Sequence, residues 1–394
     1  MRAAAAMAVI LAAAALAASA ADAPPWPWRL PAGFPVPRVP PDNPMSEAKV
    51  ELGRRLFYDR RLSLNRTQAC ADCHQQRKAF TDGRAQALGS TGAVHRRSAM
   101  SLANVAYAVS LTWADPTVRR LEDQMLIPLL GTHPVELGMG GQEAGLAARL
   151  EAEPLYVSLF AAAFPEEPKP IGLRNVQRAV ACFERTLISG DSPYDQVVYQ
   201  GKMDAMSQAA WRGMRLFFSD RLSCSRCHAG YDFSGPVDYV GTEELDDPPE
   251  PLFLNTGLYN LDGRGAYPAI DTGLRDVTRR RRDMGRFKAP TLRNIALTAP
   301  YMHDGSIATL GEVVDHYARG GRAGGDSRAR SPLLTGFTLT DAEKRDLLEF
   351  LDSLTDATFV ADPRFANPWG PDAGDQGAAG AAGIAGAQAC RMAR

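Results

Sequence analysis

Two copies of one five-residue pattern constrain this 394-residue chain more than any other feature of its sequence. Residues 70–74 (CADCH) and 224–228 (CSRCH) both read C-x-x-C-H, the attachment pattern of c-type haem. Two thiols one turn apart can reach the two vinyl groups of a porphyrin, and the adjacent His can reach the iron. A redox-active C-x-x-C or half of a zinc site is the alternative. Two copies favour two covalent haem c groups, held by Cys70, Cys73 and His74 and by Cys224, Cys227 and His228.

An internal repeat precedes both patterns. Residues 53–63 (GRRLFYDRRLS) resemble residues 213–223 (GMRLFFSDRLS), and each copy opens with a helix signal. Ser46 and Ser207 are the predicted N-caps of these helices. Two similar domains with a boundary near residue 200 explain the repeat most simply.

The remaining regular signals are helical. Apolar residues recur at helical spacing between 176 and 187, at Val176, Val180, Phe183 and Leu187. Thr309 with Glu312, and Thr340 with Glu343, form predicted capping boxes ahead of two further apolar stretches. No sustained alternating pattern of a strand occurs. We therefore expect a mainly α fold of two cytochrome-c-like haem domains with long loops, related by the internal repeat.

The two ends of the chain have unusual compositions. Residues 1–20 combine Arg2, an Ala-rich apolar run and an A-x-A site, which predicts a cleaved signal peptide and export to the periplasm. An uncleaved membrane anchor is the alternative, and no other run is long enough to span a membrane. Residues 21–44 are Pro-rich and predict an extended N-terminal strap without helix. Residues 363–394 are expected to form a disordered Gly/Ala-rich tail.

Charge and cysteine content exclude several classes of protein. Lys and Arg total 44 against 45 for Asp and Glu, so the net charge is −1. A nucleic-acid binder would carry a basic excess, and we expect no nucleic-acid partner. Six Cys in a chain of this length do not make a disulfide scaffold.

Further motifs resemble those of a known family. Residues 121–124 (LEDQ), 133–138 (HPVELG), 290–294 (PTLRN) and 298–305 (TAPYMHDG) are similar to those of the bacterial di-haem cytochrome c peroxidase/MauG superfamily. The resemblance covers roughly residues 40–360. It implies a peroxidatic haem domain at 45–200, an electron-transfer haem domain at 201–362, and hydrogen peroxide as the oxidant. Residues 101–107 (SLANVAY) and 128–136 (PLLGTHPVE) most resemble the MbnH-type enzymes, which are encoded with methanobactin and copper-binding partner proteins.

The resemblance implies roles for several side chains around the first haem. Glu136 corresponds to the distal carboxylate that moves protons, with Gln124 close by; without the surrounding motif it would be read as a solvated loop residue. Trp113 corresponds to the tryptophan between the two haems, although most Trp residues are simply core. The peroxidases carry a distal His near residues 89–92, and this chain has none there. His95 comes a few residues later and is not expected to be a ligand, so the first haem should be open.

Around the second haem, Tyr317 occupies the position where peroxidases carry a Met ligand and MauG carries a Tyr. A phenolate is an anionic, hard ligand that stabilises oxidised iron. Met302, Met284 and His316 are the rival ligands. MauG's surface Trp corresponds to Leu222 here, so the route to a protein substrate must differ.

A calcium ion between the two domains is a further, open implication of the resemblance. The family holds this calcium through a side chain at Ser98 and through the carbonyls of Thr298 and Pro300. Ser98 replaces the usual Asn, which leaves the calcium open.

The sequence thus predicts a periplasmic di-haem oxidoreductase of the peroxidase class. Peroxide would react at the His74 haem, and a residue of an exported partner protein, expected to be a Trp of a copper-binding protein encoded nearby, would be oxidised through high-valent haem iron. The alternative is a cytochrome c peroxidase that draws electrons from a small cytochrome or cupredoxin. A non-enzymatic di-haem electron carrier is the third reading, and an open haem would exclude it.

Overall fold

The structure is a computed structural model that describes residues 26–245, 249–322 and 329–370. The expected signal peptide at 1–20 lies outside these ranges, as does most of the expected tail at 363–394. Residues 26–44 of the expected strap contain no helix or strand. Within the described ranges, no helix combines the length and the apolar character needed to cross a membrane.

The described part of the chain is mainly helical, as predicted, with long loops. The α-helices are α2 (Glu47–Phe57), α3 (Cys70–Cys73), α4 (Leu121–Gln124), α5 (Leu126–Leu130), α6 (Glu143–Glu151), α7 (Pro154–Ala163), α8 (Leu173–Arg185), α9 (Pro193–Val198), α10 (Gln208–Phe217), α11 (Arg275–Thr278), α12 (Leu310–Ala318) and α13 (Asp341–Asp352). Strands β1 (Phe253–Leu254) and β2 (Phe287–Lys288) pair antiparallel, with Phe253 opposite Lys288. The described chain thus contains little sheet, in agreement with the lack of a sustained strand pattern in the sequence.

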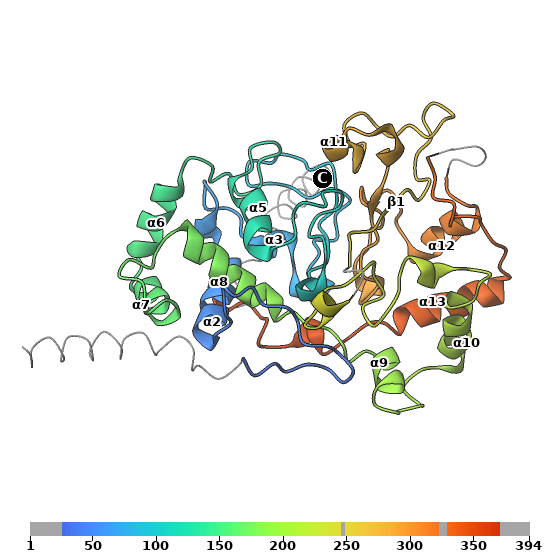
Figure 1. Ribbon diagram of the computed structural model, residues 1–394, viewed down its shortest axis with the longest axis horizontal. Helices are drawn as coiled ribbons and strands as arrows, with labels where there is room; N and C mark the ends of the chain where they lie inside the picture. The colour runs from blue at the N-terminus through green and yellow to red at the C-terminus, as the bar shows by residue number, and fades with distance from the viewer. Residues whose placement is uncertain (1–25, 246–248, 323–328, 371–394) are drawn as a thin grey trace, which may run out of the picture.

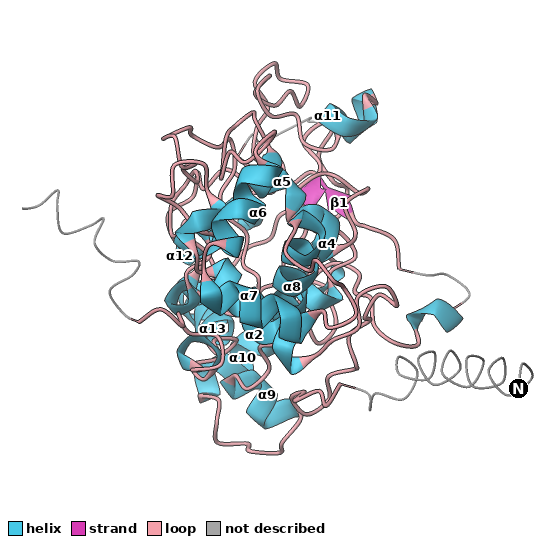
Figure 2. Cartoon of the chain, turned by 90° about the vertical axis from the view of Figure 1, so that its left-hand side faces the viewer, coloured by secondary structure: helices cyan, strands magenta, loops and turns pink. Residues whose placement is uncertain are grey.

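Two groups of helices stand on either side of the loops. In Figure 1, α2, α6, α7 and α8 gather at the left and α10, α12 and α13 at the right, with loops from both halves of the chain between them. Figure 2 looks onto the left-hand group, with α7, α2 and α8 near its centre. The loops, rather than the long helices, therefore supply most of the chain in the middle of the molecule.

In the first group, α2 packs closely against α8. Ser46 caps α2 as predicted, since its hydroxyl accepts a hydrogen bond from the Lys49 N–H. A Cβ on Gly53 would lie 1.9 Å from the Ala179 carbonyl oxygen, so only glycine permits this approach. The predicted apolar face of α8 is buried, but α8 ends at Arg185, and Leu187 is buried in the turn beyond it.

In the second group, α10 packs against α13 through a similar contact. Ser207 caps α10 as predicted. A Cβ on Gly213 would lie 1.9 Å from the Asp346 carbonyl oxygen and 2.8 Å from the Phe350 Cβ. The Thr340–Glu343 capping box at the start of α13 is confirmed. These contacts fix α10 just ahead of the second C-x-x-C-H segment.

Helix α12 begins with the other predicted capping box. The Thr309 hydroxyl accepts from the Glu312 N–H, and the Glu312 carboxylate accepts from the Thr309 N–H. The helix ends at Ala318, and Gly320 follows with φ of 71°, a left-handed conformation that favours glycine. Tyr317 therefore lies in the last turn of a well-capped helix.

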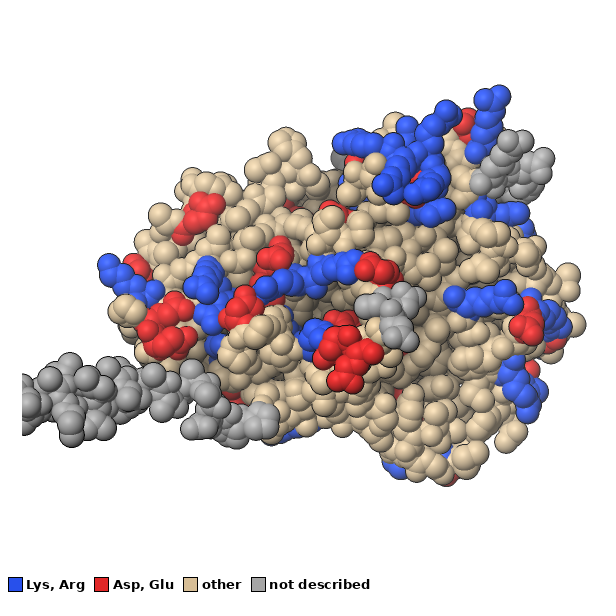
Figure 3. Space-filling model, in the orientation of Figure 1, with Lys and Arg blue, Asp and Glu red and all other residues tan. Residues whose placement is uncertain are grey.

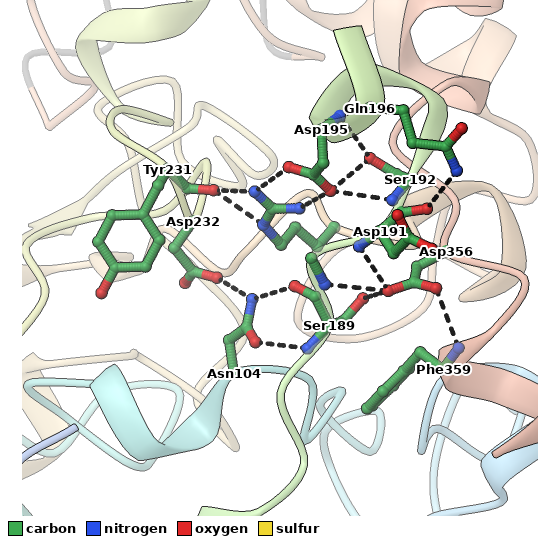
Figure 4. A network of polar contacts seen from close by, with 12 residues as sticks. Asn104, Ser189, Asp191, Ser192, Asp195, Gln196, Tyr231, Asp232, Asp356 and Phe359 are labelled. Atoms are coloured by element: carbon green, nitrogen blue, oxygen red, sulfur yellow. Dashed lines mark hydrogen bonds and ion pairs between the residues drawn. The ribbon is translucent and has the colours of Figure 1, made fainter. Parts of the chain in front are cut away.

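A buried polar network joins α9 to loop segments from both halves of the chain (Figure 4). Arg293 makes a bidentate ion pair with Asp195, and neither side chain is exposed to solvent. Asn104 donates to Asp232 at 2.8 Å and to the Ser189 carbonyl at 3.0 Å. Because unpaired buried charges are costly, these bonds hold the central loops in one arrangement.

Candidate haem sites

A cavity of about 300 Å³ adjoins the first C-x-x-C-H segment. Helix α3 is a single turn, so it sets the two thiols of Cys70 and Cys73 one turn apart. Cys73 and His74 line the cavity. His74 Nδ1 lies 2.9 Å from the Phe80 carbonyl oxygen. When Nδ1 donates this bond, Nε2 keeps a free lone pair for a metal.

A second cavity of about 220 Å³ adjoins the other segment. Cys224, Cys227 and His228 all line it. His228 Nδ1 lies 3.1 Å from the Pro290 carbonyl oxygen and 3.2 Å from that of Phe233, so its Nε2 is again left for a metal. Both segments thus place an oriented imidazole beside a cavity, with Cys73 in the wall of the first and both thiols in the wall of the second.

These residues fit one covalently attached haem in each cavity. Burial raises the pKa of Cys73 and of Cys224 to about 12, which keeps both thiols neutral. Burial also lowers the pKa of His74 and of His228, which favours the neutral imidazole that binds iron. The two sites suit zinc less well than haem. None of the described residues form a group of three or more His, Cys, Asp or Glu side chains that could hold a metal ion.

Tyr317 lines the second cavity together with the attachment residues. Burial, reinforced by the nearby Cys227 and Cys224 thiols, raises the pKa of Tyr317 above its usual range. The phenol is therefore neutral without a metal, and binding to iron would displace its proton.

The rival ligands are distributed unevenly around this cavity. His316 is turned away, with Nε2 2.9 Å from the Thr256 carbonyl oxygen, and it does not line the cavity. Met284 does not line it either, whereas Met302 lines both cavities. His303 also lines the second cavity and stacks on Phe287 at 3.6 Å between ring centroids. Of the candidate iron ligands named from the sequence, only Tyr317 and Met302 line the second cavity. The structure adds His303 as a further candidate.

Glu136 and Gln124 line the first cavity, as the family resemblance implies. Burial raises the pKa of Glu136 to about 7, so this carboxyl can both hold and release a proton near neutral pH. His95 lies beside it, with Nε2 3.6 Å from Glu136 Oε1, and lines the same cavity. His95 Nε2 is buried without a hydrogen-bond partner among the described residues. The sequence did not indicate this pairing, because the two residues share no motif.

Trp113 lines both cavities, which places its indole in the wall between them. Its Nε1 donates to the Ser98 carbonyl at 2.9 Å, and its own carbonyl accepts from the Lys288 N–H at 2.8 Å. Lys288 also lines both cavities, and burial lowers its pKa to about 8. Its Nζ donates to the Ser110 carbonyl oxygen at 2.5 Å. The sequence contained no signal for this buried lysine.

The three residues considered for calcium all border the first cavity, namely Ser98, Thr298 and Pro300. The Ser98 hydroxyl, however, donates to the Met302 carbonyl at 3.2 Å. Calcium therefore stays a prediction. Leu222, which the family resemblance aligns with MauG's surface Trp, lines the second cavity.

Comparisons with known proteins identify the family to which this chain is similar. The family model for di-haem cytochrome c peroxidase matches residues 47–204. The chain is 35% identical over 338 residues to the cytochrome-c peroxidase IdrP1 of Pseudomonas sp. (strain SCT), covering 82% of this chain and 84% of that protein. It is 34% identical over 328 residues to the methylamine utilization protein MauG of Methylorubrum extorquens, covering 83% of each.

Among solved structures, one similar protein is described as a MauG-like protein associated with microbial copper homeostasis. It shares 47% sequence identity with this chain, with a TM-score of 0.83, and the match covers 88% of this chain and all of the other. The similarity thus extends over both candidate haem sites.

Proposed function

This chain belongs to the di-haem cytochrome c peroxidase and MauG family, and from that premise we propose that it uses the oxidising equivalents of peroxide to oxidise a partner protein. The family membership makes it a peroxide-dependent di-haem oxidoreductase with haem c groups. The proposal concerns the electron donor. We infer that the donor is a side chain of another periplasmic protein, reached without entering either cavity.

The observation that carries the proposal is Tyr317 in the wall of the second cavity. A Met ligand would favour reduced iron and suit a haem that collects electrons from a small cytochrome. A phenolate favours oxidised iron, and so suits a site that stores oxidising equivalents until a slow donor arrives. The two haems supply the redox chemistry, in which peroxide takes two electrons and is reduced to water.

Side chains that line the first cavity would carry out the proton transfers of this reaction. Peroxide must give up a proton from one oxygen and gain one on the departing oxygen. The Glu136 carboxyl can do both, because burial brings its pKa to about 7. Gln124 and His95 share the cavity and can orient peroxide by hydrogen bonds. His74, with its imidazole oriented by the Phe80 carbonyl, would bind the iron of a haem in this cavity.

Between the cavities, Trp113 provides an oxidisable ring that borders both. An indole there shortens the gap that an electron must cross. Lys288 borders both cavities as well and brings a positive charge to this wall. We infer that it pairs with a carboxylate of a bound haem and holds the wall in place.

For the partner, we infer an exported copper-binding protein that is oxidised at a Trp. The support is the 47% identity to a MauG-like protein associated with microbial copper homeostasis. A basic surface suited to an acidic partner lies over α11 and the turn after it (Figure 3). The four arginines at 279–282 are all exposed there.

We also infer that the two helix groups are related by the internal repeat, as two haem domains at 45–200 and 201–362. Gly53 and Gly213 hold equivalent positions in the two repeat copies. Each lies against a backbone carbonyl, with the Cβ of a phenylalanine one turn further along the facing helix. One contact used twice supports a duplicated unit.

The competing function is a cytochrome c peroxidase supplied by a small cytochrome or cupredoxin. The 35% identity to IdrP1 favours it, as does Met302 in the wall of the second cavity. Under this alternative, Met302 would bind the second iron and Tyr317 would be a core residue.

One experiment compares both donors with the same holoenzyme. Peroxide is added with either reduced cytochrome c or the proposed copper-binding partner protein. We expect slow oxidation of cytochrome c, and a mass gain on one Trp peptide of the partner. Rapid turnover with cytochrome c and an unmodified partner would support the peroxidase instead.

A further inference from the structure

A series of aromatic rings leads outward from the second cavity. Phe287 and His303 line the cavity and stack on each other at 3.6 Å. The buried Tyr267 ring follows, 6.1 Å from Phe287 and 6.3 Å from His303 between centroids. Tyr259 comes next, 5.4 Å from Tyr267, and is partly exposed. The rings therefore bridge the distance between the cavity wall and the surface in short steps.

Tyr259, the outermost ring, has a carboxylate in position to accept its proton. Its hydroxyl donates to Asp304 Oδ2 at 2.5 Å. Asp304 is fixed in turn, because Oδ1 accepts from the Ser306 N–H at 3.0 Å. Leu261, two residues further along the chain, is 65% exposed. A phenol that loses an electron must also lose its proton, and here the acceptor is already hydrogen-bonded to it.

Tyr267 lacks such an acceptor. Its hydroxyl donates to the neutral Asn255 amide oxygen at 3.0 Å and accepts from the Leu258 N–H at 3.1 Å. No base is hydrogen-bonded to the Tyr267 hydroxyl to accept its proton. Tyr267 is therefore suited to conduct an electron but not to hold a radical. The partly exposed Tyr259 is the stable end of the series.

We propose that Tyr259 is the surface relay residue through which oxidising equivalents leave the second cavity for the partner protein. The proposal rests on the proposed oxidation of a partner by peroxide. With haem bound in the second cavity to accept the electron, Tyr259 would in each step give up one electron towards that cavity and one proton to Asp304. The resulting phenoxyl radical takes one electron from a Trp of the partner, and the proton returns from Asp304. Two such steps restore the two electrons that one peroxide removes.

The family resemblance aligns Leu222 with MauG's surface Trp, so oxidising equivalents would need another route to the surface. At this position the chain has a leucine that cannot be oxidised, although it borders the same cavity. Trp211 packs against the core between α10 and α13 and does not line the cavity. The Tyr267–Tyr259 series starts from the cavity wall itself.

The direct test is a radical measurement that needs no partner. The holoenzyme is mixed with peroxide, frozen within seconds and studied by EPR, with and without ring-deuterated tyrosine. We expect a tyrosyl signal that narrows on deuteration and is lost in Tyr259→Phe. Asp304→Asn, which can keep the bond to Ser306, should weaken the signal, and Asp304→Glu should restore part of it.

Tyr156→Phe is the matched control, because the Tyr156 hydroxyl also donates to a carboxylate at 2.5 Å, that of Asp59. Tyr156 is fully buried and borders neither cavity, so the radical signal should survive its removal. Haem content and the unfolding temperature of each variant report whether the fold is intact. A tyrosyl signal that persists in folded Tyr259→Phe overturns the proposal.

A second readout separates this relay from the proposed function. In Tyr259→Phe, modification of the partner Trp should slow by at least about tenfold, which corresponds to 1.36 kcal/mol in the barrier. If the partner is modified at the wild-type rate, the relay is wrong while the proposed function stands. If the wild-type protein forms the Tyr259 radical but leaves the partner unmodified, Tyr259 is oxidised as inferred, whereas the oxidation of a partner, and the relay to it, fail.

Discussion

At the scale of single residues, Glu136 shows how burial prepares a side chain for its chemistry. A carboxyl with the ordinary pKa of 4.5 would be ionised at neutral pH and could only accept a proton. Burial in the wall of the first cavity raises this pKa to about 7. The same side chain can then accept a proton from peroxide and return it to the departing oxygen.

Glu136→Gln should slow the reaction with peroxide by about a hundredfold, the usual effect of losing a general acid–base group. Haem content should not change. The wild-type rate should rise with pH through about 7 as the carboxyl becomes a base, and this step should vanish in the variant. Stopped-flow absorbance across the pH range measures both, and an unchanged rate in Glu136→Gln would assign the proton transfer to another group.

The same shift in pKa affects stability with a defined sign. Below pH 4.5 the carboxyl is protonated in the folded and the unfolded chain, and it contributes nothing. Between 4.5 and about 7 only the unfolded chain has released the proton, which favours unfolding. The free energy of unfolding should therefore fall with rising pH in this window. Glu136→Gln should remove that part of the fall in urea titrations, whereas an identical pH profile would contradict the assigned burial.

Several residues of the sites could be inferred from the sequence. The C-x-x-C-H segments carry their own chemistry. Glu136 and Gln124 lie in the family motifs, and Trp113 and Tyr317 follow from the wider resemblance; all four line a cavity. His95, Lys288 and His303 could not be assigned in this way. His95 lies in a loop and Lys288 in strand β2, and both reach a cavity through contacts with distant segments. His303 lies in the 298–305 motif, which by itself gave it no role.

At the scale of elements, the capped helices were predictable and the loops were not. Ser46, Ser207, Thr309 and Thr340 begin helices where the local pattern predicts it. A cap is a local hydrogen bond between residues three apart, so the sequence displays it directly. The end of α8 before Leu187 differs from the prediction, because apolar spacing continues into a turn that is buried for tertiary reasons.

Gly213→Ala tests the close packing of α10 on α13. The added Cβ would lie 1.9 Å from the Asp346 carbonyl oxygen, so the helices must separate. We expect a loss of about 1–3 kcal/mol or more in the free energy of unfolding, measured by urea denaturation. Gly145→Ala in α6 is the control, because its nearest neighbour would be 3.8 Å away and alanine should stabilise that helix. Equal effects of the two changes would contradict the packing described.

At the scale of the whole molecule, the two cavities are separate and each has its own attachment segment. Cys73→Ala and Cys227→Ala should therefore each remove one haem and leave the other in place. A pyridine haemochrome assay of the two variants and the wild type should give one, one and two haems per chain. Loss of both haems from a single replacement would mean that the sites do not load independently.

The central claim is that the two sites are unequal, with an open iron in the first cavity and an iron closed by Tyr317 in the second. EPR of the resting ferric protein tests this claim most directly. We expect one high-spin and one low-spin signal, and we expect the low-spin signal to shift in Tyr317→His while the high-spin signal stays. Two low-spin signals, or a low-spin signal unaffected by Tyr317→His, would contradict the claim.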